Sequence, residues 1–194
     1  MTFYAYHCMP DNGNNFNEVQ FHNMAAANIT TAHSYTGAKF HQACKYAEGT
    51  DLKVTKWMEN YIYNYVGWTD EAYADMLATN QTLIDEVNDV KDEPHLWGYA
   101  LIDEPRDSLF VKIGLLTKRL HELDPNHPCY VNLWGDQMCD ANLLPYVTKA
   151  NPDIISFDMY PCAYGFDPVG YWYDRLDAVH RYSEQYNIPW WGFA

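Results

Sequence analysis

The stretch that decides the fold is Leu96-Trp97-Gly98-Tyr99-Ala100-Leu101-Ile102-Asp103-Glu104-Pro105. It opens with an uninterrupted apolar run, which is typical of a strand buried on both faces of a parallel sheet. Pro105 cannot donate to a strand ladder and suits the first turn of a helix, so the strand is expected to end at the two acids. Asp103 and Glu104 are therefore predicted to lie at the carboxyl end of a core strand, where α/β folds place their chemistry.

Strand and helix patterns alternate along the rest of the chain. Six further segments have strand composition and are bounded by loop-forming residues; they are residues 2–7, 29–34, 52–57, 129–133, 154–160 and 189–194. Apolar spacing, caps and first-turn prolines predict the intervening helices, which are 17–27, 37–48, one from Thr69 through Val87, one from Asp107 or Ser108 to Leu123, 142–149 and 168–186. This repetition without hairpin signals implies parallel strands joined by crossover helices.

Two fold classes fit this alternation, an open doubly wound sheet and a (β/α) barrel. No G-x-G-x-x-G motif follows the first strand, and polar or aromatic residues follow every strand, which suits a barrel rim. The sequence therefore predicts an α/β fold of the TIM (β/α)8 type, with residues 1–194 as a single barrel domain. Because a full barrel needs about 250 residues, we expect a fragment truncated within or just after strand 7, lacking the last helix, strand and helix.

Composition argues against several classes of partner. The chain has 26 acidic and 12 basic residues, for a formal net charge of −14, whereas proteins that bind nucleic acid carry a basic patch. A membrane-spanning helix needs a run of about 18 apolar residues, and the sequence has no such run. The five cysteines have no C-x-x-C spacing and the histidines no H-x-H or H-E-x-x-H spacing, so we expect neither a metal nor a cofactor. Cellular location is left open, because a signal peptide could have been removed.

The ends of the predicted strands carry acids, amides, histidines and aromatic rings. In a barrel they would meet at one mouth, although they are far apart in the sequence. Hydrolysis of a glycosidic bond needs one carboxylic acid to protonate the leaving oxygen and a second carboxylate. Flat rings can stack on sugars, and polar side chains can bind hydroxyl groups. Besides Glu104, the candidate substrate-binding residues are His7, His33, Trp57, Asp103, Asn132, Trp134, Asp158, Tyr160 and Trp191.

Residues 98–105 resemble the fourth-strand motif of the clan A glycoside hydrolases, in which a strand ends Asn-Glu-Pro or Asp-Glu-Pro. Residues 154–161 and 188–191 are similar to the sixth and seventh strands of the β-galactosidase-like barrel proteins of that clan, many of them uncharacterised proteins of gut bacteria. The resemblance implies a glycosidase that acts on an oligo- or polysaccharide, with Glu104 as its general acid/base.

The chain departs from the clan's pattern at two places. The clan commonly has Asn before its Glu, whereas this chain has Asp103, and a neighbouring acid either raises the pKa of Glu104 or binds a sugar hydroxyl. The resemblance also implies a glutamate nucleophile about five residues after a proline in strand 7. Counting from Pro189 reaches Ala194, the final residue, which is no acid, so the expected nucleophile is either just beyond the end or missing.

Other interpretations stay open. A carbohydrate-binding barrel without catalysis fits the lack of an acid in residues 189–194. A metal-dependent barrel hydrolase would use His7, His33 and acids at the rim. Individual residues also have simple structural roles: Glu104 could only face a helix dipole, worth about 0.3–1 kcal/mol, and the tryptophans could pack in the core.

Overall fold

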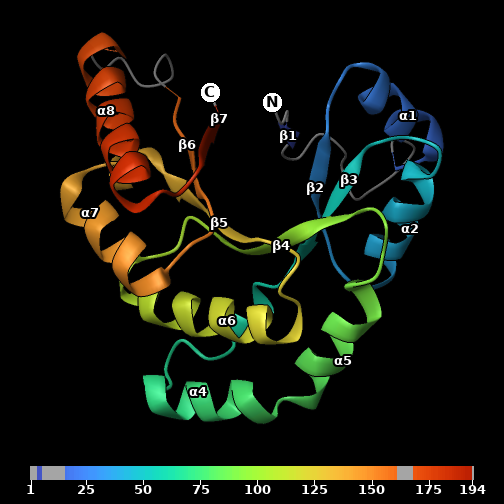
Figure 1. Cartoon of the computed structure of the whole chain (residues 1–194), viewed down its shortest axis with the longest axis horizontal. Coiled ribbons are helices and arrows are strands. Elements are labelled where there is room, and N and C mark those ends of the chain that lie inside the picture. Colours follow the sequence, from blue (N-terminus) through green and yellow to red (C-terminus); the bar gives the residue numbers. More distant parts are fainter. Residues whose placement is uncertain (1–3, 6–15, 161–167, 194) are drawn as a thin grey trace. The chain divides into compact units, whose positions relative to one another are not determined.

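The strands follow one another in the sheet as they do in the chain. The computed structural model describes residues 4–5, 16–160 and 168–193 (Figure 1). Within them, hydrogen bonding joins the strands in the order β1 to β7, and the pairings β1–β2, β2–β3, β3–β4, β5–β6 and β6–β7 are parallel. A doubly wound sheet reverses its order at a switch point, whereas a barrel keeps the order of the sequence. The order confirms the predicted α/β fold of the TIM type over the strands described.

The chain divides into two compact units that share strand β4. Unit 1 comprises residues 1–58 and 81–100, and unit 2 comprises residues 59–80 and 101–194. The prediction of a single barrel domain over residues 1–194 is not tested by this division and stays a prediction.

Unit 1 contains the first strands and three helices. Its elements are β1 (Tyr4–Ala5), α1 (Glu18–Ala26), β2 (Thr31–Tyr35), α2 (Gly37–Ala47), β3 (Lys53–Trp57), α5 (Gln81–Val90) and the first part of β4 (Leu96–Asp103). Lys56 is buried in this unit, where its ammonium group lies 2.6 Å from Glu86 and 5.7 Å from the centre of the Phe40 ring. The ion pair compensates a charge that would otherwise be costly to bury.

Unit 2 contains residues 59–80, the end of β4 and the elements that follow β4. Its helices and strands are α3 (Asn60–Tyr63), α4 (Asp70–Thr79), α6 (Phe110–Leu123), β5 (Cys129–Trp134), α7 (Asp140–Pro145), β6 (Ile155–Asp158), α8 (Pro168–Tyr186) and β7 (Trp190–Phe193). Short 3₁₀ turns lie at Asp107–Leu109 and Gly135–Gln137, and a π turn lies at Tyr146–Ala150. Among the helices that the structure describes, none combines the length and the apolar character that crossing a bilayer requires.

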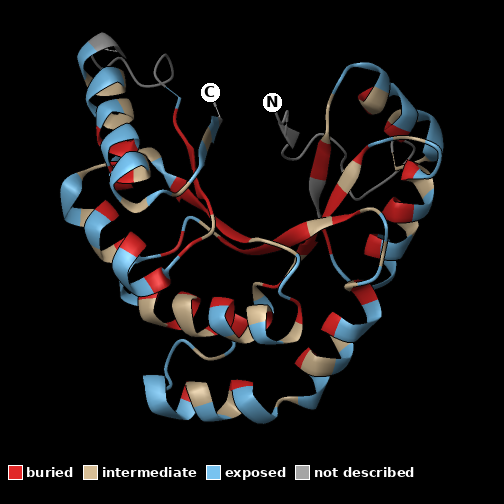
Figure 2. Ribbon diagram, viewed as in Figure 1, coloured by how far each residue is buried: buried red, intermediate tan, exposed pale blue. Residues whose placement is uncertain are grey.

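Strand β4 has the burial that its sequence predicts. Leu96 and the residues from Gly98 to Ile102 are buried, whereas Trp97 and Asp103 are partly exposed. Figure 2 shows this strand and β5 as mostly buried segments. Parallel strands in α/β folds are covered on both faces, which explains why the middle of this strand is apolar and buried.

The helix predicted from Thr69 through Val87 is two helices in the structure. Its start is as expected, because the Thr69 hydroxyl accepts a hydrogen bond from the Ala72 amide at 3.3 Å. Asn80, however, has an extended backbone with ψ 99, so α4 ends at Thr79 and α5 begins at Gln81. Thr and Asn are weak helix formers, and their side chains compete with the helical backbone for hydrogen bonds.

Helix α6 packs closely against the π turn in unit 2. A Cβ atom at Gly114 would lie 2.1 Å from the carbonyl oxygen of Lys149, so only glycine allows this approach. The rings of Phe110 and Tyr146 pack nearby, with centres 5.3 Å apart. Burying these aromatic rings supplies much of the apolar contact between the two elements.

Candidate active site

Glu104 follows the carboxyl end of β4 and has an unusual backbone. Its φ of 43° lies in the left-handed region, which costs a residue with a Cβ atom about 1–2 kcal/mol. Its amide donates a hydrogen bond of 2.7 Å to the carbonyl oxygen of Asn132, in the adjacent strand β5. Strained residues of this kind concentrate at functional sites, where the surrounding structure holds them in place.

Three carboxyl groups at the carboxyl ends of β4 and β6 interact electrostatically. The pKa of Glu104 is raised above its ordinary 4.5, first by partial burial and then by the negative charges of Asp158 and Asp103. Asp103 accepts a hydrogen bond of 3.0 Å from the side-chain amide of the buried Asn132. Glu104 therefore keeps its proton to a higher pH than an isolated glutamate does.

Asp158, at the end of β6, is the most buried of the three acids. It is 9% exposed, and burial is the largest cause of its raised pKa. The hydroxyl of Tyr160 donates to Asp158 at 3.2 Å and opposes the rise, as does the amide of Asn132, while the charge of Asp103 adds to it. Two neighbouring acids with raised pKa values keep their protons to a higher pH than isolated carboxyl groups do, which suits a proton donor.

Two exposed phenols face the same acids. Tyr160 is 53% and Tyr63 is 49% exposed. The pKa of Tyr63 is raised first by partial burial and then by Glu59, Asp103 and Glu104, which shows that α3 brings this residue close to the acids. Tyr63 has no signal in the sequence, because its helix is too short to show a periodic pattern.

A cleft of about 620 Å³ opens beside Glu104. The residues that line it include Glu104, Arg106, Asp107, Trp134, Asp136 and Asn142. The side chain of Trp134 is 48% exposed, so part of the indole ring is open to a ligand. This volume is within the range of about 300–1,000 Å³ that is usual for small-molecule sites.

Gln137 holds the wall of the cleft together. Its side-chain nitrogen donates to the Pro105 carbonyl oxygen at 2.9 Å and to Asp107 at 2.8 Å, and its side-chain oxygen accepts from the Trp134 amide at 3.2 Å. The buried amide thus joins the loop after β4 to the loop after β5. A glutamine in a loop has no sequence pattern that could have indicated this role.

Most of the predicted site residues lie in unit 2. Asp103, Glu104, Asn132, Asp158 and Tyr160 interact at one edge of unit 2, and Trp134 lines the adjoining cleft. Trp191 lies in the same unit on β7, where its indole nitrogen donates to the Ser156 hydroxyl and its ring packs against Tyr130 with centres 5.5 Å apart.

The other predicted site residues lie outside this group, and the role of every candidate stays a prediction. Trp57 belongs to unit 1, at the end of β3. His7 and the side chain of His33 lie outside the described residues, so their predicted roles stay predictions. Among the described residues, the side chains spaced to hold a metal ion are His121, Cys129 and Asp153, which are not part of the Glu104 cluster.

Comparison with solved structures shows which proteins share this fold. A glycoside hydrolase family 5 mannosidase from Rhizomucor miehei superposes with a TM-score of 0.66 at 12% identity, over 97% of this chain and 66% of that one. The chain has the fold of the clan A glycoside hydrolases. The Faecalibacterium prausnitzii β-glucuronidase also superposes on this chain, with a TM-score of 0.63 at 16% identity over 97% of this chain.

A third clan A structure, the Pseudomonas stutzeri endoglucanase Cel5A, has a TM-score of 0.61 at 14% identity, over 97% of this chain and 73% of that one. The chain spans 66% of the length of the mannosidase and 33% of that of the glucuronidase. This coverage agrees with the expectation that the chain corresponds to part of a barrel enzyme. No family model matches the sequence, and no curated protein matches it.

Proposed function

We propose that the protein hydrolyses O-glycosidic bonds of an oligo- or polysaccharide, with Glu104 as the general acid/base. The observation that carries the proposal is the raised pKa of Glu104 at the edge of an open cleft, beside Asp103 and Asp158. A glycosidic oxygen leaves readily only when it receives a proton, and a carboxylic acid with a raised pKa keeps the proton for this step to a higher pH. The clan A fold supports this proposal.

Asp158 is the proposed second carboxylate. It contributes more to the raised pKa of Glu104 than Asp103 does, and the Tyr160 hydroxyl and the Asn132 amide orient its oxygens. A carboxylate in this place either attacks the anomeric carbon or activates a water molecule. The resemblance placed the nucleophile near residue 194, and Ala194 lacks a carboxylate.

The cleft supports a carbohydrate as the substrate. Trp134 offers a flat ring for the apolar face of a sugar, while Arg106 and Asn142 offer hydrogen-bond donors to hydroxyl groups. Because the cleft begins at Glu104, a sugar bound in it would lie on the side of the bond that receives the proton. We therefore assign the cleft to the leaving group.

Replacing Glu104 by glutamine in the full chain tests the proposal. With phenyl glycosides of both anomeric configurations and several sugars, whose phenol leaves poorly without a proton, Glu104→Gln should lower turnover about 100-fold or more. The loss should be smaller for nitrophenyl glycosides, whose leaving groups need little protonation. Glu122→Gln is the matched control, because Glu122 is half exposed and pairs with Arg119 on α6. Wild-type turnover in Glu104→Gln would refute the acid/base role.

A carbohydrate-binding barrel without catalysis is the alternative. It would use the cleft beside Glu104 and the exposed ring of Trp134 to bind a sugar without cleaving it. Calorimetric titration of the wild-type chain with the same sugars distinguishes the two functions. Binding without turnover of any aryl glycoside would support the binding protein, and turnover that depends on Glu104 and Asp158 would support the hydrolase.

A further inference from the structure

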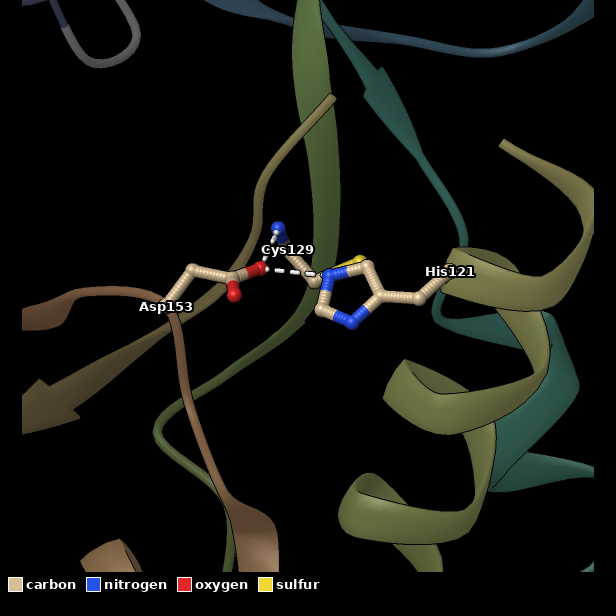
Figure 3. A group of neighbouring side chains, drawn as sticks. All are labelled: His121, Cys129 and Asp153. Atoms are coloured by element: carbon tan, nitrogen blue, oxygen red, sulfur yellow. Dashed lines mark hydrogen bonds and ion pairs between the residues drawn. The ribbon is translucent and has the colours of Figure 1, made fainter. Parts of the chain in front are cut away.

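A histidine, a cysteine and an aspartate meet at the end of the strands that is opposite to the end where Glu104 lies. His121 lies in the last turn of α6, Cys129 is the first residue of β5, and Asp153 lies just before β6. Cys129 and Asp153 thus lie at the amino ends of these strands, whereas Glu104 and Asp158 lie at carboxyl ends. All three residues belong to unit 2, and their side chains point toward one another (Figure 3).

Asp153 connects the other two residues. One of its carboxylate oxygens lies 2.8 Å from Nε2 of His121 and accepts a hydrogen bond of 2.6 Å from the backbone amide of Cys129. The donor atoms that the three side chains can offer to a ligand all lie within 4.8 Å of one another. An imidazole nitrogen, a sulfur and a carboxylate oxygen are therefore already gathered around one point.

We propose that His121, Cys129 and Asp153 bind a divalent transition metal of the zinc type. Zinc binds through thiolate, imidazole and carboxylate groups with tetrahedral geometry, and three protein ligands leave its fourth position for water. Hard cations such as calcium and magnesium prefer sites made of oxygens, so the sulfur and nitrogen donors select against them. The sequence did not predict this site, because the spacings of eight and 24 residues match no metal motif.

The burial of the three residues suits entry of a metal from solvent. Cys129 is 1% exposed and forms the floor, whereas the side chains of His121 and Asp153 are 34% and 30% exposed. A tetrahedral zinc site needs donor atoms about 3.5 Å apart. The donor atoms lie within 4.8 Å of one another and the His121–Asp153 pair lies at 2.8 Å, so metal binding requires these two partly exposed side chains to shift.

Binding would exchange a proton for the metal. A cysteine that binds no metal is mostly in the thiol form at neutral pH, because the ordinary pKa of a thiol is about 8.5. A bound dication stabilises the thiolate and takes the sulfur in that form. One metal ion therefore replaces one thiol proton, which passes to solvent, and binding should tighten as the pH rises.

Cobalt(II) titration of the metal-free full chain tests the site, because a thiolate bound to cobalt gives a charge-transfer absorption in the near ultraviolet. We expect this band at one equivalent of cobalt and its loss when zinc displaces the cobalt. His121→Gln, at a partly exposed position, should weaken cobalt binding at least about tenfold. Cys129→Ser should abolish the band. Cys44→Ser, which changes another buried free thiol in unit 1, should leave it intact.

Two results would overturn the proposal. One is the absence of the charge-transfer band in the wild-type chain at a large excess of cobalt. The other is an unchanged band in a folded His121→Gln variant, which would place the metal elsewhere. In either case the three side chains serve only to hold the start of β5 to the loop before β6, through the hydrogen bonds of Asp153.

Discussion

The backbone amide of Glu104 donates a hydrogen bond of 2.7 Å to the carbonyl oxygen of Asn132, while Glu104 itself is in the left-handed conformation. The side chain of Asn132 donates at the same time to Asp103. One residue of β5 therefore fixes both the backbone of the proposed acid and the side chain next to it. This arrangement explains how a strained glutamate is held at the end of a core strand.

Replacing Glu104 by glycine should stabilise the fold relative to Glu104→Ala. Glycine adopts a positive φ without a Cβ penalty, whereas alanine keeps the strain. We expect Glu104→Gly to be more stable than Glu104→Ala by roughly 1 kcal/mol, with turnover lost in both. Urea denaturation monitored by circular dichroism measures the difference, and equal stability of the two variants would show that the backbone at residue 104 carries no strain.

Replacing Asp103 by asparagine should move the pH dependence of turnover. The charge of Asp103 is one cause of the raised pKa of Glu104, and Glu104 must be protonated to act as an acid. Asparagine removes the charge but can still accept the hydrogen bond from Asn132, so the pKa of Glu104 should fall. The alkaline limb of kcat/KM is then expected to shift to lower pH, whereas a shift to higher pH would contradict the role of Asp103.

Asp158→Asn should stabilise the protein at neutral pH while lowering turnover. The folded pKa of Asp158 is raised above its ordinary 3.8, so its ionisation destabilises the fold as the pH rises through this range. Asparagine removes that penalty and can still accept from Tyr160. Thermal denaturation should show a higher Tm for the variant at pH 7 and little difference below about pH 3.8. A lower Tm at pH 7 would mean that the carboxylate is favourable in the folded protein.

Gly114→Ala should destabilise unit 2 although alanine is the better helix former. The added Cβ would lie 2.1 Å from the backbone carbonyl of Lys149, which cannot move without shifting the π turn. We expect a loss of about 1–3 kcal/mol in the free energy of unfolding, as for other overpacked sites. Gly67→Ala is the control, because a Cβ there meets nothing within 4 Å, and its stability should stay close to wild type.

The sequence predicted the helices and strands well where the pattern was local and uniform. The apolar run before Asp103 fixed β4, and the Thr69 cap fixed the start of α4. The break at Asn80 was missed because apolar spacing continues across it, so the periodic pattern cannot register one residue that changes backbone conformation.

The site was predicted in part. Asp103 and Asp158 lie at the ends of strands and Glu104 directly follows one, so a parallel sheet was expected to bring them together. Gln137 and Tyr63 were missed, because a loop glutamine and a residue of a one-turn helix have no pattern that ties them to distant strands. Their roles depend on contacts with residues more than 25 positions away in the chain.

By itself the sequence determined the alternation of strands and helices, the parallel order of the sheet and the identity of the acids at the strand ends. These follow from local periodicity and from the burial of apolar runs, which neighbouring residues already encode. Only the tertiary structure decided that Asp158 raises the pKa of Glu104, that Glu104 adopts a positive φ, and that His121, Cys129 and Asp153 meet at the other edge. Each of these depends on which distant side chains become neighbours when the chain folds, and electrostatic and steric effects act over that distance in space, not along the sequence.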